Sequence, residues 1–205
     1  MALLTTTVRA KRHAALAGAE ATHLTNILTS ASAIAETYCH RVFTSTAYTG
    51  ATVELQDGDG GDWIFVKNPP ITAFTSIVVE DAYGDSETIL AAEFNRDNNT
   101  GRIQFKVDAD SDFSYFPTGI QNIDIDYTGG YAAIPDEVQD AVILIAIDMY
   151  GKGSMANPNL KSEKLGEYSY VRFDPKDGPL TAPSSYLSGM VKAMLGPYRI
   201  FGGDY

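Results

Sequence analysis

The stretch YTGGYAAIPDEVQDAVILIAIDMY, which runs from Tyr127 to Tyr150, decides how this chain folds. It predicts the end of a strand, a turn at the Gly-Gly pair, and then a helix. Pro135 marks the helix start, because the N–H that proline lacks would have no partner in the first turn. Asp136 and Glu137 follow and place negative charge at the positive end of the helix dipole.

The helix after Pro135 is expected to lie inside the core. Every side chain from Ala141 to Ile147 is apolar, so apolar groups cover nearly all sides of the helix. The run is too short to cross a bilayer, which needs about 20 apolar residues. We therefore expect the segments before and after this helix to supply the walls of its core.

Composition restricts the classes of protein to which the chain can belong. Its 205 residues are 44% hydrophobic and 20% charged, which is enough for a real core and unlike a disordered chain. The formal net charge of −11 argues against a surface that grips a nucleic-acid duplex, although DNA can still pass an acidic wall without adhering to it. The lone Cys39 excludes an internal disulfide and favours a reducing cytoplasm of origin. We expect a soluble protein with no signal peptide, no transmembrane segment and no membrane partner.

The segment before the central strand divides into helical and β-type parts. Thr7 to Ala17 is rich in alanine, and Glu20 to His40 has apolar residues at steps of three and four, so both predict helices. From Val42 to Tyr127, short β-type runs alternate with turn sequences, and Asn98 to Gly101 indicates a hairpin. Six or seven antiparallel strands are expected there.

These patterns predict an α+β fold, in which a small helical bundle of three to four helices carries an inserted antiparallel β-sandwich-like domain. The helical core is expected at residues 1–43 and 128–205, and the inserted domain at 44–127. After the central helix, Gly151 to Pro183 predicts a long connection, within which GEYSYVRF (Gly166 to Phe173) favours a strand. A last helix is expected from Pro183, with Leu187, Met190, Val191, Met194 and Leu195 on its buried stripe.

No stretch of the sequence has all the residues required for a catalytic, metal-binding or cofactor-binding motif. DGDGGD (Asp57 to Asp62) and DADSD (Asp108 to Asp112) lack the glycine and glutamate positions of a calcium loop. GKGS (Gly151 to Ser154) lacks the upstream glycine of a phosphate-binding loop. The three histidines have no metal-ligand spacing, and Cys39 lies in an amphipathic helix as a packed thiol. We therefore expect no enzyme activity, no metal and no cofactor.

Two segments suit assembly with other proteins. The tail Tyr198, Arg199, Ile200 and Phe201 mixes aromatic, basic and aliphatic groups, as interface anchors do, but it can equally fold back on its own helix. The connection from Gly151 to Pro183 is either a partner-binding arm or a solvated loop. Its candidate contact residues are Lys152, Lys161, Lys164, Tyr168 and Tyr170.

Five stretches, in this order, resemble the head–tail connector (adaptor) proteins of tailed bacteriophages, the family grouped as gp6-like or gp15-like connectors. The stretches are SASAIAETYCHRVF (Ser30 to Phe43), VKNPPITAFTSIVVED (Val66 to Asp81), IDIDYTGGYAAIPDEVQDAVILIAIDMY (Ile123 to Tyr150), KLGEYSYVRF (Lys164 to Phe173) and LSGMVKAMLGPYRIF (Leu187 to Phe201). Their order and spacing carry the resemblance, since no single stretch is specific. Compact members of the family are almost wholly helical, so this chain is similar to the larger form with a β insertion.

The resemblance implies a virion protein of the neck, assembled in the host bacterial cytoplasm. Such a protein forms a ring, usually of twelve subunits, beneath the portal protein. The ring extends the channel for genomic DNA without sequence-specific contact and is the platform for a stopper or tail-completion protein. Tyr198 to Phe201 would then dock on the portal, and the lysines and tyrosines of the Gly151–Pro183 connection would reach the channel or a neighbouring subunit. The alternatives are another virion ring protein, such as a tail terminator, and a carbohydrate-binding module suggested by Trp63 and Tyr83.

Overall fold

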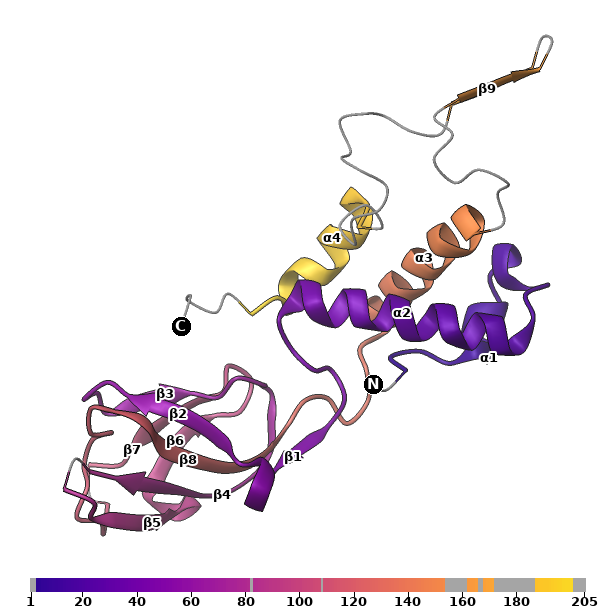
Figure 1. The fold of residues 1–205 in the computed structure, drawn as a ribbon. Coiled ribbons are helices and arrows are strands. Elements are labelled where there is room, and N and C mark those ends of the chain that lie inside the picture. Colours follow the sequence, from indigo (N-terminus) through magenta and orange to yellow (C-terminus); the bar gives the residue numbers. More distant parts are fainter. Residues whose placement is uncertain are drawn as a thin grey trace. The chain divides into compact units, whose positions relative to one another are not determined.

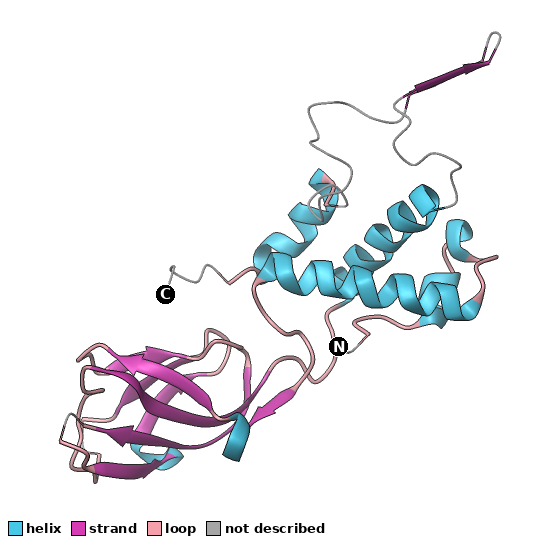
Figure 2. Cartoon of the chain, in the orientation of Figure 1, coloured by secondary structure: helices cyan, strands magenta, loops and turns pink. Residues whose placement is uncertain are grey.

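The computed structural model describes residues 3–81, 83–107, 109–153, 162–165, 168–171 and 187–200. The chain divides into two compact units (Figure 1): unit 1 comprises Met1–His40 and Ile134–Tyr205, and unit 2 comprises Arg41–Ala133. Unit 1 contains the α-helices, whereas unit 2 is built from strands (Figure 2). The predicted α+β class is therefore confirmed.

Unit 1 is a small bundle in which α2 packs against α3, and α3 packs against α4. Its elements are α1 (Thr7–Lys11), η1 (Ala14–Leu16), α2 (Ala21–Cys39), α3 (Asp136–Gly153), α4 (Gly189–Leu195) and η6 (Gly196–Tyr198). A separate antiparallel pair is formed by β9 (Ser162–Leu165) and β10 (Tyr168–Val171), so the strand expected within GEYSYVRF is confirmed.

Helix α2 has the boundaries that the sequence predicts. The Glu20 side chain caps its start by accepting hydrogen bonds from the Thr22 and His23 amides at 2.9 and 2.7 Å. His40 ends it in the left-handed conformation, with φ of 54°. On the apolar face that the spacing predicts, Ile34 and Tyr38 are half-buried, and the buried residues are Leu24, Ile27, Leu28, Ala31 and Ala35.

The single helix expected from Thr7 to Ala17 is wrong. Helix α1 stops at Lys11, and a separate 3₁₀ turn, η1, follows. The His13 ring closes that turn, because its Nδ1 accepts from the Ala15 amide at 3.4 Å. A continuous helix would need helical backbone angles at His13, but its φ and ψ are extended, so the helix is interrupted there.

Helix α3 is the core helix that the sequence predicts. Its buried residues include Val138, Ala141, Val142, Ile143, Ile145 and Ala146. Pro135 precedes it, and the Gln139 side chain donates to the Ile134 carbonyl at 2.9 Å. The helix continues to Gly153, so the expected start of the connection at Gly151 is wrong.

Helix α4 buries only part of the expected stripe, since Leu187 and Met194 are half-buried. Val191 and Leu195, four residues apart, are buried, whereas Met190 is 65% exposed. The described helix begins at Gly189, after Ser188 accepts from the Val191 amide at 3.3 Å. Because seven residues make only about two turns, a narrow stripe suffices to bury it. The expected start at Pro183 lies outside the described residues.

Unit 2 holds two antiparallel sheets. The first has the order β1-β8-β4-β5, with β2 also paired to β8, and the second has the order β3-β7-β6. The strands are β1 (Thr46–Tyr48), β2 (Glu54–Gly58), β3 (Trp63–Phe65), β4 (Ile71–Glu80), β5 (Ser86–Leu90), β6 (Phe94–Asp97), β7 (Arg102–Phe105) and β8 (Gly119–Gly129), with 3₁₀ turns η2 (Gly50–Thr52) and η3 (Ala91–Glu93).

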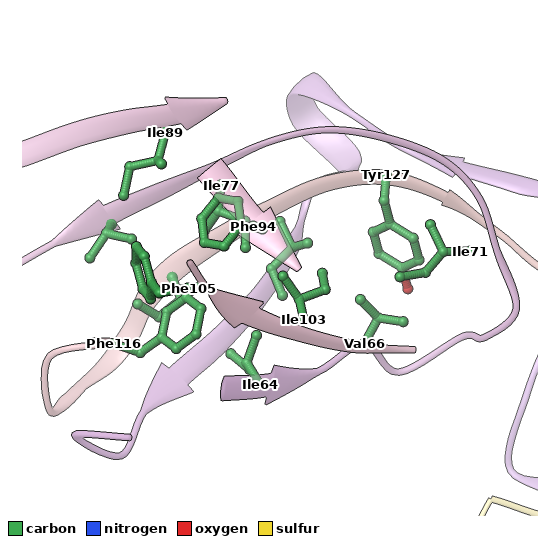
Figure 3. Packing of buried hydrophobic residues seen from close by; sticks show 13 residues of the cluster. Ile64, Val66, Ile71, Ile77, Ile89, Phe94, Ile103, Phe105, Phe116 and Tyr127 are labelled. Carbon is green, nitrogen blue, oxygen red and sulfur yellow. The ribbon is translucent and has the colours of Figure 1, made fainter. Parts of the chain in front are cut away.

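The two sheets of unit 2 enclose one hydrophobic core (Figure 3). Ile123, Ile125 and Tyr127 point into it from β8, as the alternation with aspartates predicts. Phe105 and Phe116 pack with ring centroids 4.8 Å apart, and Phe94 lies 4.8 Å from Phe105. The core therefore has the sandwich-like character expected from the sequence.

Turn chemistry accounts for the predicted hairpin between β6 and β7. The two strands pair antiparallel, and Gly101 adopts the φ of +76° that favours glycine. The sequence did not predict β1 or β5. Strand β5 is mostly polar and lies at a sheet edge, where one row of side chains faces solvent and the apolar signal is weak.

Candidate functional site

The C-terminal segment Tyr198–Ile200 is half-buried and bonded to the helices of unit 1. The Ile200 amide donates to the Cys39 carbonyl at 3.0 Å, and the Tyr198 hydroxyl hydrogen-bonds to the Glu137 carboxylate at 3.1 Å. The Arg199 guanidinium lies 5.3 Å from the centroid of the Tyr38 ring. The segment thus runs from α4 to the end of α2 and the start of α3. Phe201 lies outside the described residues.

Cys39 is part of this arrangement as a packed thiol. It is fully buried at the last turn of α2, and its Sγ lies 3.7 Å from the Leu195 carbonyl, to which it donates. Its carbonyl accepts from the Ile200 amide, so Cys39 contacts α4 through its thiol and the C-terminal segment through its carbonyl. The sequence identified the thiol as structural, but it could not show which segment the thiol contacts.

Of the residues predicted for the Gly151–Pro183 connection, the β9–β10 pair brings Lys164 beside the strand that carries Tyr168 and Tyr170. Lys152 lies in the last turn of α3, Lys164 lies in β9, and Tyr168 and Tyr170 lie in β10. The register places Lys164 opposite Ser169 and Tyr170 opposite Glu163. Lys161 is outside the described residues. Their role in channel or subunit contacts remains a prediction.

Ion pairs join α1, near the start of the chain, to α3. Arg9 forms ion pairs with Asp136 and with Asp140, the latter at 2.7 Å. These hydrogen bonds raise the pKa of Arg9 further above its usual value. Thr5 adds a 3.4 Å hydrogen bond to Gln139 on the same helix. The sequence identified Asp136 only as a charge at the helix start.

Unit 2 contains a buried carboxylate, which sequence reasoning missed. Glu54 accepts hydrogen bonds from the Lys67 amide at 2.9 Å, from the Gln56 side chain and from the Tyr127 hydroxyl. The Asn68 amide in turn donates to the Tyr127 hydroxyl at 3.2 Å. Burial, and then the charge of Glu54, raise the pKa of Tyr127 far above its usual value. This network ties β2, β8 and the 67–68 loop together, and its satisfied donors suit a structural role.

Aromatic side chains lie on the solvent-facing side of the β3-β7-β6 sheet. Trp63 and Phe65 on β3 are 42% and 46% exposed, and their rings lie edge to face with centroids 5.2 Å apart. The Arg102 guanidinium lies 5.5 Å from the Trp63 ring centroid. The sequence singled out Trp63, but only the strand register shows that it shares a face with Phe65 and Arg102.

The described residues offer no group of three or more His, Cys, Asp or Glu side chains that could hold a metal ion. In the Asp57–Asp62 loop, Asp59 instead accepts from the Gly61 amide at 2.8 Å, as in a hydrogen-bonded turn. No helix within the described part of the chain combines the length and apolar character needed to cross a membrane.

Comparisons with known proteins give one family. A family model described as "Head completion protein" matches residues 3–161. A search of curated proteins found no match.

Solved structures of gene transfer agent (GTA) particles contain similar chains. One, described as "Neck of empty GTA particle computed with C6 symmetry", has 20% sequence identity and a TM-score of 0.56 over 100% of this chain and 97% of that chain. Another, "Neck of native GTA particle computed with C12 symmetry", has 19% identity and a TM-score of 0.47 over 88% of this chain and 86% of that one. At 20% identity, the likeness to the first of these chains is one of fold. The family match covers most of the chain and agrees with the connector resemblance seen in its sequence; this protein belongs to the head completion protein family.

Proposed function

We propose that this chain is a structural protein of the virion neck, which joins the DNA-filled head to the tail by binding and not by catalysis. The observation that carries the proposal is the match to head completion proteins across residues 3–161. A chain of similar fold in the neck of a GTA particle supports it. The order of the five sequence stretches that resemble head–tail connectors also supports it.

In this proposal the subunits form a ring, of twelve copies as in the connectors that the sequence resembles, beneath the portal protein. Genomic DNA passes through the ring without sequence-specific contact, and a stopper or tail-completion protein binds on the far side. Repetition around the ring makes weak contacts collectively strong, because each further contact is effectively intramolecular. The candidate residues of the Gly151–Pro183 connection would contact the channel or a neighbouring subunit.

The docking segment in this proposal is Tyr198–Phe201. Tyr198, Arg199 and Ile200, the described part of this segment, contact α2 and α3 of unit 1. A segment that is ordered before binding loses less conformational entropy when a partner covers it. The fold-back conformation and the docking role are therefore compatible, and the half-exposed aromatic and arginine side chains supply the anchor chemistry.

Cryo-electron microscopy of assembled particles that contain this protein tests the position directly. We expect the subunit at the junction of head and tail, in contact with the portal. A position at the end of the tail tube would instead identify a tail terminator, and a position on a surface fibre would favour the carbohydrate-binding alternative. Either of these placements refutes the proposal.

Removal of residues 201–205 tests the docking segment while it leaves the Tyr198 and Ile200 contacts in place. We expect subunits that fold but join heads to tails poorly, in a complementation assay with purified heads. Met190→Ala is the matched control, because Met190 is an exposed apolar residue of the neighbouring α4. Normal joining by the truncated subunit would exclude Phe201 from the docking surface.

A further inference from the structure

The outer face of the β3-β7-β6 sheet is a largely solvent-exposed surface made of two rows of side chains. Directly opposed residues of antiparallel strands point to the same face. The register therefore aligns one row from Phe65 to Asp97 and a second from Trp63 to Asn95. The six residues of this surface, here called the β3 face, are Trp63, Phe65, Asn95, Asp97, Arg102 and Gln104.

The β3 face is supported by the hydrophobic core on the opposite side of the sheet and by hydrogen bonds to neighbouring residues. Ile64 and Ile103, on the opposite side of the same strands, are buried in the core (Figure 3). The Gln104 side chain donates to Asp62 at 2.7 Å, and the Gln56 side chain donates to the Phe65 carbonyl at 2.6 Å. These contacts hold the backbone that carries the two exposed aromatic rings, and a preorganised backbone lowers the entropy cost of binding.

The charge of the chain is concentrated in the unit that carries this face. Unit 2 holds 15 of the 26 acidic residues but only 5 of the 15 basic ones, so its formal charge is −10 out of the chain's −11. Unit 1 is therefore close to neutral. On the β3 face itself, Arg102 is aligned with Asp97 across the strand pair, so its positive charge is offset locally.

We propose that the β3 face binds a protein partner whose surface is basic, with apolar side chains among its lysines and arginines. Trp, Phe and Arg are typical of the residues that dominate interface energies. The negative charge of unit 2 favours a positively charged partner, since complementary potentials steer association and like charges oppose it.

The same charge excludes two other occupants. Nucleic-acid strands can stack on Trp and Phe, but phosphate would approach a unit of charge −10. A second copy bound face to face would bring two units of that charge together. A basic protein surface is attracted by the negative charge of unit 2, whereas nucleic acid and a second copy of the chain are repelled by it.

This inference gives unit 2 a partner of its own and does not depend on the portal contact proposed for unit 1. Because the test below uses the isolated full chain, its failure would leave the neck assignment standing. The neck assignment can fail in particles while the β3 face still binds basic peptides.

The experiment is selection of random-sequence peptides, displayed on a carrier, against the immobilised full chain. We expect the selected peptides to be enriched in Lys and Arg with interspersed apolar residues, and to bind more weakly as salt is raised. Trp63→Ala/Phe65→Ala should weaken their binding by about 30-fold or more, the scale of a lost hot spot. Tyr83→Ala is the matched control, because Tyr83 is an aromatic residue of unit 2 that is 93% exposed.

A second variant guards against loss of folding. Phe65→Ser changes one half-exposed side chain, and its circular dichroism spectrum should match that of the parent. Basic peptides that bind this variant and the double variant as tightly as the parent overturn the proposal. Selection of acidic or uncharged peptides, or of no peptides, also overturns it.

Discussion

Replacement of Tyr127 by phenylalanine tests whether the buried Glu54 network stabilises unit 2. The substitution removes only the hydroxyl, which donates to Glu54 and accepts from the Asn68 amide at 3.2 Å. A hydrogen bond to a charged group contributes about 1.5–3 kcal/mol, and a buried N–H left without a partner costs about 1–3 kcal/mol. Since Glu54 keeps its other two donors, we expect the free energy of unfolding of unit 2 to fall by about 3 kcal/mol.

Trp63 makes this change measurable in unit 2 alone. It is the chain's only tryptophan and lies in that unit, so its fluorescence during urea denaturation reports the unfolding of unit 2. Tyr83→Phe removes a hydroxyl from an exposed tyrosine of the same unit and is expected to change the free energy by less than about 0.5 kcal/mol. Equal midpoints and slopes for the two variants would refute the reasoning.

The pH dependence of the same variant gives an independent check. Burial raises the pKa of Tyr127 in the folded state, whereas in the unfolded chain it is near the usual value of 10.0. Above that pH the unfolded state loses a proton that the folded state keeps, so the stability falls as pH rises. One such group contributes a slope of about −1.4 kcal/mol per pH unit. Tyr127→Phe lacks this slope, so its deficit relative to the parent should shrink above pH 10; a constant deficit would contradict the assignment.

Three further predictions concern other contacts. Gly129→Ala should destabilise unit 2 by about 3 kcal/mol or more, because its Cβ would lie 2.1 Å from the Asn68 carbonyl oxygen, whereas Gly18→Ala meets no atom within 4 Å; urea denaturation of both variants checks this. Arg9→Ala should cost less than about 1 kcal/mol, and less still in high salt, since its partners Asp136 and Asp140 are largely exposed; thermal unfolding followed by circular dichroism measures the loss, and a salt-independent effect would contradict it. Backbone hydrogen bonds lower the pKa of Glu20, so Glu20→Ala should reduce the melting temperature of unit 1 at neutral pH but lose its effect as pH falls below about 4.5; an effect that persists in acid would exclude the cap as its cause.

Regular periodicity was the reliable guide to the helices and to the longest strand. The spacing from Leu24 to Ala35 predicts the buried face of α2, and alternation with aspartate predicts that Ile123 and Ile125 point inward. The signal weakens where elements are short. Strand β5 at a sheet edge went unpredicted, and the break after Lys11 depends on capping by one histidine. The gp6-like or gp15-like subfamily and the domain boundaries at residues 43 and 128 stay predictions.

The contacts of the candidate sites required the tertiary structure. Tyr198 and Arg199 attracted notice by composition, but their partners Glu137 and Tyr38 are remote in sequence. Glu54 gives no signal in the sequence, because a single acidic residue in a short strand does not reveal that it is buried. Gln56 lies on the same strand, but the Lys67 amide and the Tyr127 hydroxyl come from other segments, and only folding brings these two donors within reach.

The sequence by itself determined the class of fold, the core helix, and the family to which the ordered stretches point. These depend on local periodicity and on short-range turn and capping chemistry, which the chain carries along its length. Tertiary structure alone decided that Trp63, Phe65 and Arg102 share one exposed face and that Tyr127 meets a buried carboxylate. Both outcomes depend on strand register, which is set by the pairing of distant segments around a common core.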